Sequence, residues 1–219
     1  PPAVVEASDN EIEYLCAAAN RFLAKPISSN DVVWSYAGLR PLQDDASDDL
    51  SAATRDYALD VDAAAGRPPL LCVIGGKITT YRRLAEHALD RLAPWLPRRS
   101  GLPAGWTSTA PLPGGDLAHA DFEAFRAAFL ARHPWLPAAL ANRFCHTYGS
   151  NADRLIDDAR ALADLGENLG QGLTAREVDY LAKAELAQTA EDILWRRTKL
   201  GLEGGAPLAE RVARHLRRA

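Results

Sequence analysis

The stretch Pro69–Leu92, PLLCVIGGKITTYRRLAEHALDRL, constrains the fold of this chain more than any other segment. Its first six residues, Pro69–Ile74, are almost wholly apolar, which is typical of a short strand buried on both faces. Two glycines follow, and apolar residues then recur at helical spacing as far as Leu92. The segment therefore predicts a strand, a tight Gly75-Gly76 turn and an amphipathic helix.

This turn is a candidate binding site. Glycine reaches positive φ angles and lets the backbone approach a ligand, and the first turn of the following helix offers free N–H groups to an anion. Lys77 adds positive charge. A P-loop would need Gly at position 71 and Ser or Thr at position 78, where this chain has Leu71 and Ile78. We expect an anionic or carbonyl-bearing ligand rather than ATP or GTP, with a purely structural connection as the alternative.

Further elements are predicted on the N-terminal side of this turn. A Ser/Asp/Asn cluster followed by apolar residues at three- and four-residue spacing predicts a helix from Ser8 to about Lys25. Asp31–Arg40 and Thr54–Val61 are predicted to be strands, and the acidic residues 44–49 a solvated loop. Because only turns separate the second strand from the third, we expect an antiparallel or mixed sheet.

The composition changes after residue 92. Residues 93–115 are rich in proline and glycine and are predicted to be a linker. The residues beyond it read as a small helical bundle, with helices at about 119–132, 137–147, 151–161, 174–198 (with a break) and 207–218. Gly170–Ala175 has the G-x-G-x-x-A spelling but no strand before it, so we interpret it as an interhelical loop with an N-cap at Thr174.

The fold class expected is thus α+β. Residues 1–92 would hold a mixed or antiparallel sheet with helices, and residues 116–219 an all-α domain.

Composition excludes several classes of function. A net charge of −4 lacks the basic excess of a nucleic-acid binder. No apolar run is long enough to span a bilayer and no secretory signal is recognisable. Three distant cysteines and five histidines without a second ligand at i+4 argue against disulfides and metal sites and favour a reducing cytosol.

Two arginines at predicted strand ends could bind an anion. Arg40 precedes Pro41 and follows Gly38 by two residues, which would free its guanidinium to grip a carboxylate or phosphate. Arg55 lies in the segment TRDY and has the same capacity. The alternative for both is an ordinary surface arginine paired with a neighbouring aspartate.

The C-terminal residues 196–219 contain seven Lys or Arg against two Glu. This excess could attract an anionic surface. The alternative function is therefore a helical interaction or membrane-docking module, although a solvated helical face explains the same charges.

Several of these segments together resemble the FAD-dependent, respiratory glycerol-3-phosphate dehydrogenases, specifically their C-terminal part. The matching segments, in chain order, are DVVWSYAGLRPL, TRDYALD, LLCVIGGKITTYRRLAEHAL, PLPGGD, YGSNADRL and TAEDILWRRTKLGL. The resemblance covers nearly the whole chain from about residue 8.

The resemblance implies a specific activity and fold. Such enzymes oxidise sn-glycerol 3-phosphate to dihydroxyacetone phosphate and pass electrons through FAD to membrane quinone. It also implies a cytoplasmic protein peripherally associated with the inner face of the membrane, and residues 1–92 as the C-terminal part of the FAD and substrate domains. The oligomeric state is left open, with a homodimer as one alternative.

The resemblance also implies site residues. Gly75, Gly76, Lys77, Ile78 and Thr79 match the loop around the pyrimidine end of the flavin ring, where Lys77 and the helix N-terminus would stabilise negative charge on reduced flavin. Arg40 matches the arginine that grips the substrate anion, and Lys77 could also reach the substrate. Arg55 is carried over as a further catalytic residue.

The family's glycine-rich ADP-binding stretch has no counterpart in this sequence, which also lacks Met. An isolated turn leaves most of the FAD-binding surface missing. We therefore expect this polypeptide to be a fragment, inactive by itself and holding little or no flavin.

Overall fold

A computed structural model of the protein describes residues 5–39, 56–97 and 105–218. The chain divides into two compact units, Pro1–Ala110 and Pro111–Ala219. The first contains a β-hairpin and the second is mainly helical, so the predicted α+β class is confirmed.

Helix α1, Asp9–Ala19, begins where the sequence predicts. Ser8 and Glu11 form a capping box, in which the Ser8 amide donates to the Glu11 carboxylate at 2.8 Å. The helix ends before the predicted Lys25, and the Asn20 side chain instead binds both the N–H and the C=O of Ile27, each at 2.8 Å. These two bonds turn the chain where the apolar spacing alone would have continued the helix.

The predicted strand at Asp31–Arg40 is wrong in its described part. Ser29–Asp31 is a 3₁₀ turn, and residues 32–39 make no strand pairing among the described residues. Trp34 and Tyr36 stack on each other, with ring centroids 5.1 Å apart. β-branched and aromatic residues favour a strand only where a neighbouring strand supplies hydrogen bonds and packing.

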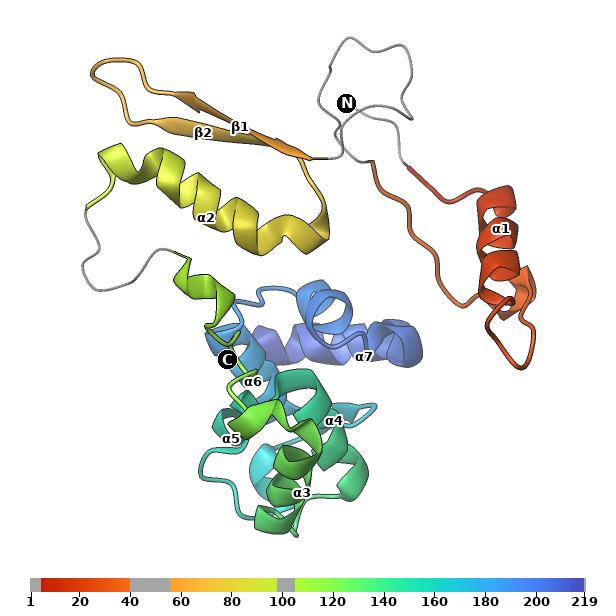
Figure 1. The fold of residues 1–219 in the computed structure, drawn as a ribbon. Coiled ribbons are helices and arrows are strands. Elements are labelled where there is room, and N and C mark those ends of the chain that lie inside the picture. The colour runs from red at the N-terminus through yellow and green to blue at the C-terminus, as the bar shows by residue number, and fades with distance from the viewer. Residues whose placement is uncertain (1–4, 40–55, 98–104, 219) are drawn as a thin grey trace. The chain divides into compact units, whose positions relative to one another are not determined.

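The other two predicted strands pair with each other. Strand β1, Tyr57–Asp62, runs antiparallel to β2, Leu70–Gly75, in a register that places Tyr57 opposite Gly75 and Asp62 opposite Leu70. The expected antiparallel pairing is therefore confirmed. The expected burial of β2 on both faces is wrong, since Leu70 is 60% exposed and Val73 48% exposed. A two-stranded hairpin is too narrow to enclose a strand, and α2 covers it from one side (Figure 1).

Helix α2, Tyr81–Leu92, follows a 3₁₀ turn at Ile78–Thr80. Arg82 and Glu86 of α2 form one hydrogen-bonded cluster with Thr107, and the Thr107 hydroxyl holds the pKa of the Glu86 carboxyl below its ordinary value. This cluster ties α2 to the 3₁₀ turn Trp106–Ser108.

The helical unit is built from short helices joined by tight turns. In chain order they are α3 (Phe122–Arg132), α4 (Ala138–Tyr148), α5 (Asn151–Ile156), α6 (Ala175–Ala184), a π-helical turn η7 (Asp192–Arg197) and α7 (Gly201–Leu216). Residues from all of them form one core, whose largest fully buried side chains include Phe129, Phe144, Leu155, Ile156, Leu181 and Leu208.

Helix α5 is shorter than the predicted 151–161, since it ends at Ile156, before Asp157 with a φ of +48°. The break expected within 174–198 is confirmed, because α6 ends at Ala184 and Leu186 has a φ of +56°. Helix α7, Gly201–Leu216, is kinked at Gly205, and its part after the kink corresponds to the helix predicted at 207–218. Left-handed residues interrupt the helical hydrogen-bond ladder although the apolar spacing continues across them.

The segment Gly170–Ala175 is not simply a loop. Asn168–Gly170 (β3) and Leu173–Thr174 (β4) form a minute antiparallel hairpin before α6. The predicted N-cap is confirmed, since the Thr174 hydroxyl accepts the N–H of Glu177 at 3.3 Å.

Two glycine motifs lock the beginning of the helical unit to the end of α4. The Gly114 carbonyl accepts the N–H of Ser150 at 3.0 Å, and a Cβ on Gly149 would lie 1.9 Å from that same carbonyl oxygen. The Ser150 hydroxyl also bonds the Asp116 carboxylate. Gly114 and Asp116 of PLPGGD therefore meet Gly149 and Ser150 of YGSNADRL in a close contact between two backbone segments.

Candidate functional site

The predicted glycine turn has the backbone conformation that only glycine adopts freely. Gly75 has a φ of +73° and Gly76 a φ of +92°, both in the left-handed region. They join the end of β2 to the 3₁₀ turn that opens α2. The two glycines thus turn the chain directly from the hairpin into a helix N-terminus.

Space as well as backbone angle disfavours a side chain at position 76. A Cβ there would lie 3.2 Å from the Cβ of Tyr57, which is tighter than an ordinary contact, and 3.7 Å from the Cδ1 of Leu84, which is an ordinary contact. A side chain at Gly76 would therefore crowd Tyr57 of the strand.

The residues after the glycines form a local cap. The Thr80 hydroxyl donates to the Lys77 carbonyl at 2.8 Å, and the Lys77 N–H points back to the same hydroxyl at 3.4 Å. Ile78 and Thr79 begin the first helical turn, whose N–H groups have no acceptor inside a helix. The side chains of Lys77, Ile78 and Thr79 are all exposed, and Ile78 is 90% exposed.

This arrangement can receive a ligand with negative charge or carbonyl oxygens. The two glycines leave the approach free of Cβ atoms, the first-turn amides are donors, and the ammonium of Lys77 is on the same segment. The pyrimidine end of a flavin ring has this chemistry, so the residues present fit FAD.

The structure tests the position of only some predicted site residues. Gly75, Gly76, Lys77, Ile78 and Thr79 form one continuous turn. Arg40 and Arg55 lie outside the described residues, as does the acidic loop at residues 44–49.

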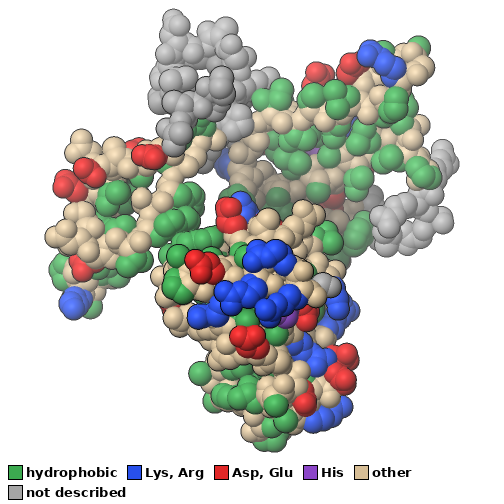
Figure 2. All heavy atoms as spheres, turned by 180° about the vertical axis from the view of Figure 1, so that it is seen from behind, with side chains coloured by type: hydrophobic (Ala, Val, Ile, Leu, Met, Phe, Trp, Pro, Cys, Tyr) green, Lys and Arg blue, Asp and Glu red, His purple; other side chains and the backbone are tan. Residues whose placement is uncertain are grey.

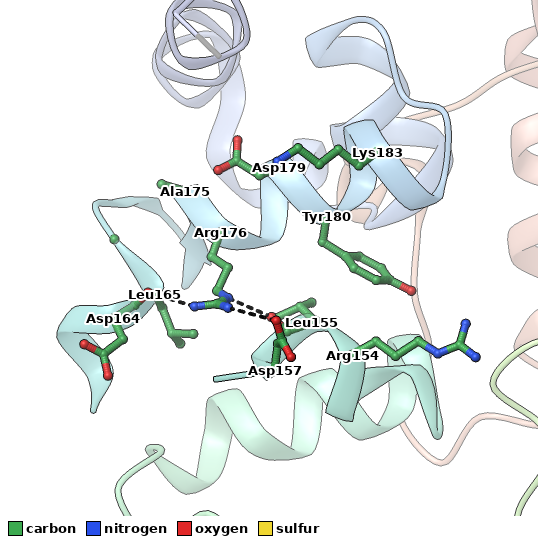
Figure 3. A pocket seen from close by; sticks show the side chains of 11 residues that line it. Arg154, Leu155, Asp157, Asp164, Leu165, Ala175, Arg176, Asp179, Tyr180 and Lys183 are labelled. Carbon is green, nitrogen blue, oxygen red and sulfur yellow. Dashed lines mark hydrogen bonds and ion pairs between the residues drawn. The ribbon is translucent and has the colours of Figure 1, made fainter. Parts of the chain in front are cut away.

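A pocket in the helical unit is lined by several charged side chains, of which Arg176 pairs with Asp157 at 3.9 Å (Figure 3). Arg176 donates to the Leu155 carbonyl at 3.0 Å and to the Asp158 carboxylate at 2.5 Å. On the far side of α6, Asp179 pairs with His215 at 2.8 Å. Arg176 thus stabilises the turn after α5.

A buried polar cluster in the helical unit was not predicted. Glu177 is fully buried, and both its carboxylate oxygens accept hydrogen bonds from Arg143, at 2.7 and 2.6 Å. The hydroxyl of Tyr148 donates to the same carboxylate at 2.5 Å, and burial, followed by the charge of Glu177, raises the pKa of Tyr148. Thr174 followed three residues later by Glu177 signals a helix start, but no local signal shows that this glutamate lies inside the core.

Three histidines in the described ranges have hydrogen-bond partners, and no group of three potential metal ligands occurs in those ranges. His87 lies beside Tyr57, His133 beside Asp153 and His215 beside Asp179.

Much of the basic C-terminal segment is bound within the helical unit. Arg197 donates to the Glu185 carbonyl, Arg211 to the Leu169 carbonyl, and Arg196 pairs with Glu191. Arg214, Arg217 and Arg218 are exposed. Figure 2 shows Lys and Arg side chains gathered on one face of the helical unit.

In the part of the chain that the structure describes, no helix is long and apolar enough to cross a membrane.

The fold is that of an α+β protein in which a glycine turn leads from a hairpin into a helix N-terminus. The model of the family described as the C-terminal domain of alpha-glycerophosphate oxidase matches residues 106–219. Since this match spans more than half of the chain, the chain belongs to that family.

Curated relatives extend the similarity to the first unit. A glycerol-3-phosphate dehydrogenase of Pseudomonas aeruginosa is 51% identical over 201 residues, covering 92% of this chain and 38% of the relative. The aerobic glycerol-3-phosphate dehydrogenase of Escherichia coli is 42% identical over 215 residues, covering 98% of this chain and 42% of the relative. A D-erythritol 1-phosphate dehydrogenase of Brucella abortus is 44% identical over 195 residues, covering 89% of this chain and 38% of the relative. The chain thus spans about two fifths of the length of these relatives.

Proposed function

We propose that this chain is the C-terminal portion of a flavoprotein that oxidises sn-glycerol 3-phosphate to dihydroxyacetone phosphate. The observation that carries the proposal is the Gly75-Gly76 turn at the N-terminus of α2, in a chain that is 51% identical to a glycerol-3-phosphate dehydrogenase. FAD, when bound, supplies the acceptor for the hydride that leaves the substrate carbon.

The turn would hold the pyrimidine end of FAD. Gly75 and Gly76 allow close approach, and the backbone N–H groups of Ile78 and Thr79 are available as donors. Lys77 and the α2 N-terminus would stabilise negative charge on the reduced ring, because both place positive charge at this end of the helix. Lys77 would also reach toward the substrate.

The substrate anion would be bound by arginine. Arg40 is proposed to bind the phosphate of the substrate through its planar guanidinium, and Arg55 to assist it. Replacing either by lysine should weaken binding, because lysine is a point charge without the bidentate fork. The expected result is a higher KM for Arg40→Lys, measured on the complete product of the gene that encodes this chain.

The identity of the phosphorylated polyol has a second candidate. The relative from Brucella abortus, named for D-erythritol 1-phosphate, is 44% identical to this chain, about as similar as the relative from Escherichia coli. Both names denote a dehydrogenase of a short polyol phosphate, which is consistent with one phosphate-binding arginine and a variable remainder of the pocket.

The electrons are proposed to pass from FAD to membrane quinone, with the protein cytoplasmic and peripherally associated with the inner face of the membrane. The exposed arginines at and just beyond the end of α7, Arg214, Arg217 and Arg218, are compatible with contact with an anionic surface. Co-sedimentation with liposomes, with and without residues 196–219, separates this role from a purely structural one.

The experiment that tests the proposal is purification of the complete gene product. We expect a yellow protein that reduces a dye acceptor with glycerol 3-phosphate, with D-erythritol 1-phosphate assayed in parallel. A colourless preparation that oxidises neither compound after FAD is added would overturn the proposal. The separate 219-residue chain should retain little flavin after dialysis, since one turn supplies only a small part of an FAD site.

A further inference from the structure

The side chain of Tyr57 links the start of β1 to α2. Tyr57 is the first residue of β1 and lies opposite Gly75 in the hairpin register. Its hydroxyl oxygen lies 2.6 Å from Nδ1 of His87, in the second turn of α2, and the two rings are 5.8 Å apart. One hydrogen bond thus joins the end of the hairpin to the helix that follows it.

The glycine turn packs against Tyr57, one of the two residues of this hydrogen bond. The nearest atom to a Cβ on Gly76 would be the Cβ of Tyr57, at 3.2 Å, followed by side-chain atoms of Leu84 and Thr80 at 3.7 and 3.9 Å. Tyr57, from the strand, and Leu84, from the helix, therefore form the floor of the turn. The distance between β1 and α2 therefore sets the position of the Gly75–Thr79 backbone.

We propose that Tyr57 and His87 are positioning residues for the Gly75–Thr79 turn. This inference rests on the proposed function, because the turn matters to catalysis only if it holds the flavin. Neither side chain is assigned a contact with the substrate or the cofactor. Their hydrogen bond fixes the distance and tilt of α2 relative to the hairpin, and so fixes where Lys77 and the first-turn amides lie.

The position of the turn matters because charge stabilisation depends on geometry. A displacement of about 1 Å in a positioned group can cost on the order of a hundredfold in rate. A second polar contact of α2, the cluster of Arg82, Glu86 and Thr107, joins the helix to the turn at Trp106–Ser108, and its side-chain hydrogen bonds among the described residues do not include the Gly75–Thr79 turn. It provides a control on the same helix.

The first test uses amide hydrogen exchange on the 219-residue chain. Tyr57→Phe removes only the hydroxyl, and His87→Leu removes its partner. Thr107→Val removes the other polar contact of α2. We expect faster exchange at the hydrogen-bonded amides of Lys77, Thr80 and Tyr81 in the first two variants but not in Thr107→Val. Unchanged exchange at these three amides in Tyr57→Phe and His87→Leu would overturn the inference without any reference to flavin.

The second test uses the complete gene product. Tyr57→Phe should retain FAD while its flavin midpoint potential falls and kcat decreases about tenfold, with little change in KM. His87→Asn, whose side-chain amide can replace Nδ1 as a partner, should restore much of the loss seen in His87→Leu.

The outcomes separate this inference from the proposed function. If the wild-type protein binds no FAD, the proposed function fails, whereas the exchange experiment still tests the hydrogen bond between Tyr57 and His87. If the wild-type protein is active and Tyr57→Phe matches it in potential and kcat, the positioning role is wrong. Equal losses in Tyr57→Phe and Thr107→Val would also contradict it, because they would indicate general loosening of α2.

Discussion

Arg143 donates hydrogen bonds to both carboxylate oxygens of Glu177 across 34 residues of sequence. Glu177 is completely buried, whereas the Arg143 side chain is 22% exposed and lies over the ring of Phe144 at 5.1 Å. This ion pair joins α4 to α6 inside the core of the helical unit. It has a surface counterpart of equal length, Arg126 with Glu123, at 2.6 Å.

Glu177→Ala should destabilise the helical unit strongly. Removing one partner of a buried ion pair leaves an uncompensated charge and typically costs about 3–5 kcal/mol, and the partial exposure of Arg143 places the expected loss near the lower end. Glu123→Ala should cost less than about 1 kcal/mol, because its pair is exposed. Urea unfolding of both variants measures the difference, and similar losses would contradict the assignment.

Gly149→Ala should destabilise the unit more than Gly172→Ala. Both glycines are left-handed, with φ of +54° and +71°, so each substitution carries a backbone cost of about 1–2 kcal/mol. At Gly149 the new Cβ would also overlap the Gly114 carbonyl oxygen, whereas at Gly172 its nearest neighbour is Leu140 at 3.8 Å. The overlap should add about 1–3 kcal/mol. Thermal unfolding of the two variants provides the comparison, and equal stability would show that the segments do not meet closely.

Asp192→Asn should make the free energy of unfolding fall less steeply as the pH is lowered into the acid range. The Asp192 carboxylate accepts the N–H groups of Gln188 and Thr189 at 3.0 Å, and these bonds hold its pKa below the ordinary value of 3.8. Because the folded-state pKa is the lower one, this contribution is present above pH 3.8 and is lost as the pH falls through the folded-state value.

Denaturant unfolding as a function of pH tests this prediction. Its control is Glu191→Gln, which changes the neighbouring, more exposed carboxylate that pairs with Arg196. A profile of Asp192→Asn that is as steep as that of the wild type would refute the proposed linkage.

Gly76→Ala should lower flavin retention in the complete gene product. The new methyl group would crowd Tyr57 and displace the turn. Gly66→Ala is the matched control, since Gly66 is also left-handed, at +78°, and a Cβ there would have no described atom within 4 Å. Absorbance after gel filtration gives the flavin content. Full retention by Gly76→Ala would remove this turn from the proposed site.

Several elements were predictable because their signals are local. The capping box of Ser8 with Glu11, the N-cap at Thr174 and the glycines at positions 75 and 76 involve residues within three positions of one another. Short-range hydrogen bonds and backbone angles depend on neighbouring residue types, so the sequence alone indicates them.

The sequence predictions were wrong where pairing or burial depends on residues far away in the sequence. The β-branched run at Val32–Leu39 has no strand partner in the described ranges, and the apolar strand β2 has only one neighbour there. Propensity describes what a segment can adopt, while pairing and burial depend on what the rest of the chain brings to it.

By itself, the sequence determined the strand–glycine turn–helix unit, the helical second half and the family resemblance, all of which follow from local spacing and residue type. Only the tertiary structure decided that Glu177 is buried against Arg143, that Gly149 abuts Gly114, and that Tyr57 reaches His87. Each of these pairs is separated by 30 or more residues, and such contacts form only when folding brings separate elements together.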